Sequence, residues 1–215
     1  VYERLTDLVA HGYLERLQEA GGPLYQVARQ PFRQTLYSTL DPERRVLLHR
    51  RLAELLEERL RRGETALVAA VAEHFWRGGE RSQSLPYLTW AAEEATAVYA
   101  YAQAAGLYGR AAEAAAESAD AEMAAQALVA QAEALTSAGS FSRALKIYQE
   151  QIRRPGVDRI LLARLHLRKG RLHTRVGEHE AALASHEEGL RRLGDLRQPD
   201  LEIDLLHGKA LALRD

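Results

Sequence analysis

The sequence predicts an all-α protein in the main, a solenoid of antiparallel helix pairs with one short β-hairpin near its N-terminal end. Alanine, leucine, glutamate and arginine, all strong helix formers, dominate the composition, and only 6 of 215 residues are proline. From residue 65 onward, short turn signals separate amphipathic segments of ordinary helix length. Small residues also recur every 38 to 40 positions, which indicates a stacked repeat.

Charge and residue usage exclude several classes of protein. The 29 lysines and arginines nearly balance 30 aspartates and glutamates, so no global field attracts nucleic acid or an anionic membrane. The absence of cysteine excludes disulfides, thiolate metal sites and cysteine nucleophiles. No apolar run reaches the roughly 18 residues that a membrane span needs.

The N-terminal segment, residues 1–14, mixes charges into an amphipathic pattern and does not read as a signal peptide. It has no starting methionine and begins in mid-pattern, so we expect the chain to be a piece of a longer protein. A cytoplasmic location is the corresponding expectation.

The first predicted elements are a helix, a hairpin and a second helix. The first helix carries Leu5, Leu8 and Val9 on one face and stops at Gly12. Two apolar runs then flank Gly21-Gly22-Pro23, which predicts a β-hairpin with a glycine turn. A short helix follows, and we expect its apolar residues to point inward; these are Phe32, Leu36, Tyr37 and Leu40.

A long helix is predicted next, from Pro42 to about Arg62. Asp41 is a good N-cap, proline suits the first helical position, and Gly63 ends the helix. We expect an apolar stripe to face the core, formed by Val46, Leu48, Leu52, Leu55, Leu56 and Leu60. Helix, hairpin, helix and helix is the order at the end of a winged-helix unit. We therefore divide the chain into a winged-helix-like remnant (1–62), a connecting helix (63–80) and a repeat region (81–215).

The repeat region shows small residues at equivalent places in successive helix pairs. In the first helix of each pair the candidates are Ala92, Ala132, Gly170 and Gly208. In the second helix they are Ala104, Ala144 and Ala182, each followed four residues later by a large ring, in Tyr108, Tyr148 and His186. A small residue lets two helices approach, and the large residue fills the space beside it. This spacing resembles the tetratricopeptide signature, with slightly longer units.

Four histidines lie within residues 166–186, at His166, His173, His179 and His186. Three of them occupy positions where the repeat usually has aromatic residues, so the favoured interpretation is half-buried, hydrogen-bonded packing histidines. A metal site is an alternative, but chelating pairs are usually four residues apart, and we expect no tight zinc site and no cofactor. A pH-responsive interface is the third interpretation, because histidine titrates near neutrality.

The same helix carries a second pattern, a stripe of arginines opposite its packing face. Arg164, Arg168, Arg171 and Arg175 fall at i, i+4, i+7 and i+11. A solvated face is one interpretation. The other is a partner-binding groove, because the first helices of such repeats line the concave surface and arginine binds carboxylates. Lys209 would extend the stripe, and Glu93 and Glu133 would form an acidic opposite end.

Two segments resemble the bacterial signal-transduction ATPases with numerous domains, which include the large LuxR-type regulators. Residues 25–58 resemble the end of their winged-helix region, although Gln30 stands where that family often has histidine. The matching positions are Leu40, Arg44 or Arg45, His49, Ala53, Leu56 and Glu57. Residues 72–113 resemble their first sensor repeats. The resemblance implies a separate ATPase module, and this chain contains no G-x-x-x-x-G-K-[ST] phosphate loop.

Three functions compete on this sequence. The first is a non-enzymatic interaction and sensor arm that binds a protein, an acidic peptide or a small inducer in its groove. The second is DNA binding, which the hairpin opposes because it carries Glu15 and Glu19 against one arginine. The third is an enzyme, for which we find no nucleophile elbow, phosphate loop or H-E-x-x-H motif. We expect the first function, with no membrane and no nucleic-acid partner.

Overall fold

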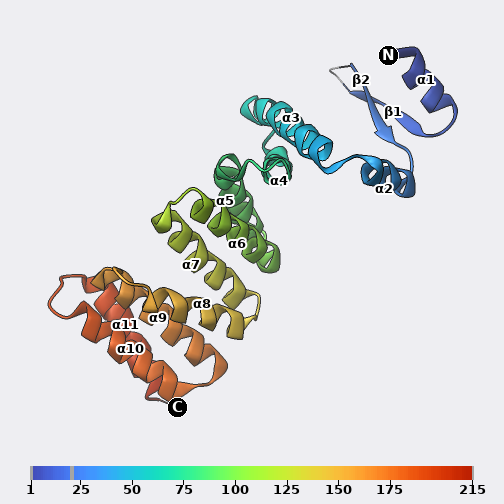
Figure 1. Cartoon of the computed structure of the whole chain (residues 1–215). Helices are drawn as coiled ribbons and strands as arrows, with labels where there is room; N and C mark the ends of the chain where they lie inside the picture. The colour runs from blue at the N-terminus through green and yellow to red at the C-terminus, as the bar shows by residue number, and fades with distance from the viewer. Residues whose placement is uncertain (1, 20–21, 215) are drawn as a thin grey trace.

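The computed structural model describes residues 2–19 and 22–214, and these residues form one elongated, mainly helical molecule (Figure 1). The N-terminal elements are α1 (Tyr2–Ala10), β1 (Leu14–Glu19), β2 (Gly22–Val27), α2 (Gln30–Thr39), α3 (Pro42–Arg61), the short 3-10 helix η1 (Thr65–Leu67) and α4 (Val68–Arg77). The stacked helices are α5 (Arg81–Ala97), α6 (Tyr101–Glu117), α7 (Ala121–Ser137), α8 (Phe141–Arg153), α9 (Arg159–Val176), α10 (His179–Leu193) and α11 (Pro199–Ala212). The predicted fold class is confirmed.

The β-hairpin is present where the sequence predicts it. β1 and β2 pair antiparallel with Leu14 opposite Val27, and the Gln26 side-chain amide donates to the Glu15 carboxylate across the strands at 2.9 Å. Part of the predicted glycine turn, Gly21, lies outside the described residues. Gly12 follows α1 with φ +70°, as expected of the predicted stop.

The predicted inward face of α2 is wrong. This helix has no buried residue, and its apolar side chains Phe32, Leu36 and Tyr37 are exposed, Leu36 to 57%. The physical reason lies in what surrounds the helix. Among the described residues, α2 meets its neighbours at few points, so its apolar side chains find no core to enter.

The predicted cap of α3 is confirmed, but half of its apolar stripe faces solvent. The Asp41 carboxylate accepts from the Arg44 amide at 2.8 Å, and the helix ends before Gly63. Ala53 and Leu60 are buried against α4, whereas Leu48, Leu52 and Leu55 are exposed. In the described part of the chain only α4 and η1 cover α3 to any extent, and they cover one side of it.

The seven stacked helices begin at nearly constant intervals, at residues 81, 101, 121, 141, 159, 179 and 199. The steps are 20 residues except for one of 18, so two helices give the predicted repeat of 38 to 40. Successive helices lie side by side in Figure 1 and pack against each other. Every small residue predicted at a helix contact is buried, and the three in the second helices are fully so; these are Ala104, Ala144 and Ala182.

In several turns between the helices, a residue after the helix end has a left-handed backbone conformation with positive φ. Gly79, Gly139 and Gly177 have φ between +76° and +83° there, but Ala119 holds the same place with φ +56°. The Ala119 and Asp120 amides donate to the Ala116 and Ala115 carbonyls, which fixes this conformation.

Ala119→Gly is therefore expected to raise the free energy of unfolding by about 1 kcal/mol, because a Cβ in the left-handed region costs roughly 1–2 kcal/mol and glycine loses part of this gain to chain entropy. Urea denaturation measures it. Ala138→Gly is the control, since Ala138 caps α7 at φ -77°. An equal gain in the free energy of unfolding from both substitutions would show that the positive φ of Ala119 is not the cause.

Within the part of the chain that the structure describes, none of the helices combines the length and the apolar character needed to cross a bilayer.

Candidate functional site

A groove of about 790 Å3 lies between the first helices of two successive pairs, α7 and α9. The end of α8 and the loop that joins it to α9 close one side. The floor is apolar and includes Ala125, Val129, Leu161 and Leu165, of which Leu165 is almost fully buried. A volume of this size accommodates a short peptide segment or a small molecule.

Charged and amide side chains form the rim of the groove. Glu122 and Gln126 stand on α7, and Arg164 is exposed on α9. Arg154 donates to the Ala121 carbonyl at 2.8 Å and so ties the loop to the start of α7. The Asp158 carboxylate caps α9 by accepting from the Leu161 amide at 2.9 Å. An apolar floor within a polar rim is a typical recognition surface.

The arginine stripe of α9 has the predicted direction, and two of its members form ion pairs with neighbouring helices. Arg164, Arg171 and Arg175 are exposed, Arg168 is half-buried, and the opposite side of the helix is buried. Arg168 forms an ion pair with Glu133 of α7. Arg171 pairs with Asp204 of α11 at 3.0 Å.

The remaining two arginines of the stripe differ from each other. Arg175 lies over the Phe141 ring at 5.8 Å from its centroid, whereas Arg164 lines the groove. Two members of the stripe are therefore compensated from neighbouring first helices. Repulsion along α9 is correspondingly small, since each exposed pair of like charges costs only a few tenths of a kcal/mol.

The other predicted groove residues fall in different places. Glu133 lines the groove, but it is paired with Arg168 and does not form a separate acidic end. Glu93 is exposed on α5 and does not line the groove. Lys209 on α11 pairs with Glu187 at 2.9 Å, also away from it. The groove thus brings together Glu133, Arg164 and Arg168 from the predicted set.

Three of the four histidines are packing residues, as predicted, and more deeply buried than expected, whereas the fourth, His179, is half-buried at the start of α10. His166, His173 and His186 are exposed by 6%, 7% and 0%. His173 shares a hydrogen bond of 2.6 Å with Glu178. The prediction of hydrogen bonding is wrong for His166 and His186, because their ring nitrogens have no hydrogen-bond partner among the described residues.

His186 fills the space between two glycines of the neighbouring first helices. A Cβ added at Gly170 of α9 would lie 2.5 Å from its Cε1 atom, and one at Gly208 of α11 would also collide with the ring. The imidazole thus occupies the aromatic position of the repeat. Burial lowers the pKa of His186 first of all, and the Arg171 charge lowers it further.

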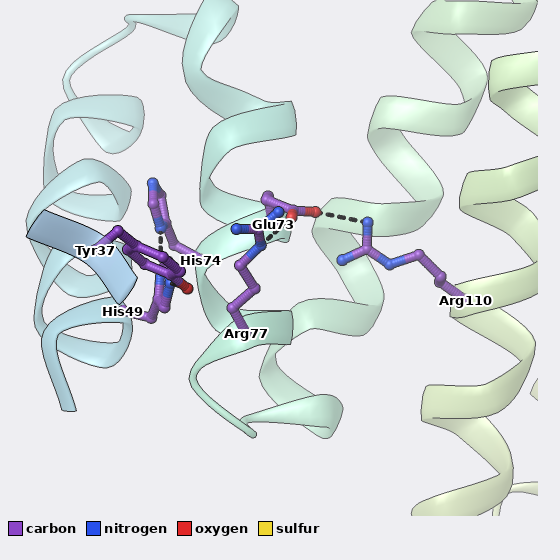
Figure 2. Close-up of polar contacts among 6 residues, drawn as sticks. All are labelled: Tyr37, His49, Glu73, His74, Arg77 and Arg110. Carbon is purple, nitrogen blue, oxygen red and sulfur yellow. Dashed lines mark hydrogen bonds and ion pairs between the residues drawn. The ribbon is translucent and has the colours of Figure 1, made fainter. Parts of the chain in front are cut away.

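A second polar cluster lies where α2, α3 and α4 meet, and sequence reasoning did not identify it (Figure 2). The Tyr37 hydroxyl lies 2.9 Å from Nε2 of His49, and Nδ1 of His49 lies 2.8 Å from Nδ1 of His74. Both spacings are hydrogen-bond distances. No group of three or more histidine, cysteine or carboxylate residues suited to a metal occurs among the described residues.

An acidic residue with two arginine partners stands beside this cluster. Glu73 of α4 forms ion pairs with Arg77 of its own helix and with Arg110 of α6, the latter at 2.7 Å. Arg110 also lies over the Trp76 ring, 4.5 Å from its centroid. These arginines hold the pKa of Glu73 below its usual value against the effect of burial. The network connects α4 to the stacked helices (Figure 2).

Comparison with known proteins finds a likeness of fold. No family model matches the chain, and neither does any curated protein. BtubC (BKLC) from P. vanneervenii is a similar solved structure, with a TM-score of 0.50 and 17% identity over 80% of this chain and 85% of that one.

A second solved structure is a Signal Transduction ATPase with Numerous Domains with a tetratricopeptide repeat sensor, from Pyrococcus horikoshii. It matches with a TM-score of 0.45 and 14% identity, and the match covers 97% of this chain but only 30% of that one. The likeness to BtubC at low identity concerns the fold alone. The chain is a mainly α-helical solenoid.

Proposed function

We propose that this chain is a non-enzymatic interaction and sensor arm, and that the groove between α7 and α9 binds a segment of a partner protein. The observation that supports this most is the groove itself, which combines an apolar floor with an exposed guanidinium, Arg164, at its rim. The partner segment is an extended peptide with apolar side chains and at least one carboxylate. A small inducer with the same two features is the alternative ligand.

Arg164 is the residue of the stripe that is best placed for a carboxylate. Glu133 already compensates Arg168, and Asp204 already compensates Arg171. A ligand that approached those two would have to displace a protein carboxylate, whereas Arg164 on the groove rim is exposed. A guanidinium offers paired hydrogen bonds to one carboxylate, which gives orientation as well as affinity.

In this proposal the chain belongs to a multidomain bacterial signalling or transcriptional regulator of the LuxR-type large class. The helix–hairpin–helix–helix order at the N-terminal end and the resemblance of residues 25–58 support this assignment. The ATPase and output activities of such a regulator would reside in other domains. A winged-helix fragment that binds DNA is the competing function, which the balanced charge disfavours.

Arg164→Glu is expected to weaken binding of a fluorescein-labelled peptide of alternating glutamate and leucine by at least about tenfold, because about 1.4 kcal/mol of attraction is lost or reversed. Fluorescence anisotropy measures the dissociation constant. Arg143→Glu is the matched control, since Arg143 is exposed on α8 and does not line the groove.

Equal weakening by both substitutions would show that net charge alone drives binding, and would contradict the groove as the site. Equal affinity of the normal chain for an alternating lysine and leucine peptide would contradict the acidic partner. Retention of the chain on duplex DNA at low salt would favour the competing function.

A further inference from the structure

Tyr37 of α2 contacts both α3 and α4: its neighbours are His49 and Arg45 of α3 and Arg77 of α4. α2 has no buried residue, and Leu40 and Asp41 link it directly to α3. The Tyr37 ring packs edge-on against His49, with centroids 5.9 Å apart, and Arg45 lies over its face at 5.3 Å. Among the described residues, the contacts of α2 with α3 and α4 are therefore mostly polar, and α2 contributes no buried side chain to a hydrophobic core.

The relay from Tyr37 to His74 requires that at least one of two facing nitrogens lacks a proton. Nδ1 of His49 and Nδ1 of His74 are 2.8 Å apart, so one ring donates and the other accepts. If His49 donates through Nδ1, its Nε2 accepts from the Tyr37 hydroxyl when His49 is neutral and donates to that oxygen when it is charged. One shared proton is thus compatible with the relay, but two imidazolium rings are not.

We propose that Tyr37, His49 and His74 form a pH-sensitive latch that holds α2, and through α2 the hairpin, in a fixed orientation relative to α3 and α4, and that protonation of both histidines opens it. With two imidazolium rings, two N–H groups and two positive charges face each other at the shared contact. The rings must then separate, and His49 carries the contact with Tyr37 (Figure 2).

The charged groups around the latch are mostly positive, which opposes protonation near neutral pH. Arg33 of α2 and Arg77 of α4 act on His74, and Arg77 acts on His49 as well. Arg45 lies on the far side of Tyr37, and Glu73 opposes these charges but is neutralised by its arginine partners. Burial is the largest effect that lowers the pKa of both histidines below the usual 6.5. Arg77 adds to it for His49, and for His74 the charge of His49 adds to it before those of Arg77 and Arg33. The latch is therefore closed at neutral pH and opens in mild acid.

The test uses the absence of cysteine, because two introduced cysteines then carry the only spin labels. A reporter pair joins the hairpin to the solenoid, Arg16→Cys with Gln83→Cys. A reference pair lies within the solenoid, Gln83→Cys with Arg143→Cys. All three positions are exposed. Between about pH 8 and about pH 5 we expect the reporter pair to lose its single narrow distance and the reference pair to keep it.

His74→Phe keeps a ring at the contact but cannot be protonated, and His74→Gln serves as a second variant if the first fails to fold. Either is expected to abolish the pH response of the reporter pair. The proposal is overturned if the reporter distance is the same at both pH values, or if the response persists in the folded variant. It is also overturned if the reference pair broadens equally, because the solenoid itself then opens.

Discussion

Gly170→Ala is expected to lower the free energy of unfolding by about 2 kcal/mol, although alanine is the better helix former. The added Cβ would lie 2.5 Å from Cε1 of His186, whose ring is fully buried. The ring cannot retreat, because Gly208 of α11 stands equally close on its other side. Overpacking of this kind costs up to about 3 kcal/mol, and helix propensity returns about 1 kcal/mol.

Gly106→Ala is the control for this prediction, and the opposite sign is expected. Gly106 lies within α6, and a Cβ there meets nothing within 4 Å. Alanine should therefore raise the free energy of unfolding by about 1 kcal/mol through helix propensity alone. Urea denaturation of both variants measures the two effects. A gain at both glycines would show that the contact of His186 with Gly170 does not limit packing.

A double variant tests whether the cost of Gly170→Ala comes from the His186 ring. In a chain that carries His186→Ala, the space beside Gly170 is empty, and Gly170→Ala should lose most of its cost. If the cost stays the same in that background, the clash is with some other group.

The sequence predicts the stacked helices well because close helix packing requires small residues at the contact positions. Gly170, Ala182 and Gly208 must be small for the helices to touch, so the length of the repeat can be predicted from their spacing in the sequence. The burial of the apolar faces of α2 and α3 was harder to predict from the sequence. Periodicity shows that Leu48 and Leu52 share one side of a helix, but it does not show what covers that side, and in the structure they are exposed.

In the candidate site, too, the sequence predicts which face of a helix a residue occupies but not which residues of other helices it contacts. Helical geometry places Arg164, Arg168 and Arg171 on the face opposite His166, and the exposure of Arg164 and Arg171 follows from this placement. Their partners come from other helices, and Glu133 pairs with Arg168 across 35 positions of sequence. Such pairing depends on how far neighbouring helices are shifted along each other. The residue pattern of a single helix contains no information about this shift. The relay of Tyr37, His49 and His74 was missed for this reason, since three different helices supply it.

The stability of the solenoid is expected to fall by about 3 kcal/mol as the pH drops from about 7 to about 4, through His166 alone. This side chain is 6% exposed, and within the described part of the chain its ring nitrogens have no hydrogen-bond partner to stabilise a charge. Burial is the main reason that its pKa falls from 6.5 to about 4; the Glu188 charge opposes this shift, and the charges of Lys169, Arg191 and Arg192 add to it.

The sign follows from which state binds the proton. Between about pH 6.5 and about pH 4 the unfolded chain protonates this histidine and the folded chain does not, so acid favours unfolding. Above that window the contribution is fully present, and below it no further loss comes from His166. His186 acts in the same direction, since its pKa is also lowered by burial.

His166→Leu replaces the ring with an apolar side chain of similar size that binds no proton. It should therefore flatten the dependence of the unfolding free energy on pH within this window, and raise stability at about pH 5 relative to the normal chain. His207→Asn is the matched control, because His207 is exposed on α11, and the slope should not change. Urea denaturation at a series of pH values measures the slope for each chain. An unchanged slope in His166→Leu would mean that this buried ring is charged in the folded protein, or that other groups govern the acid response.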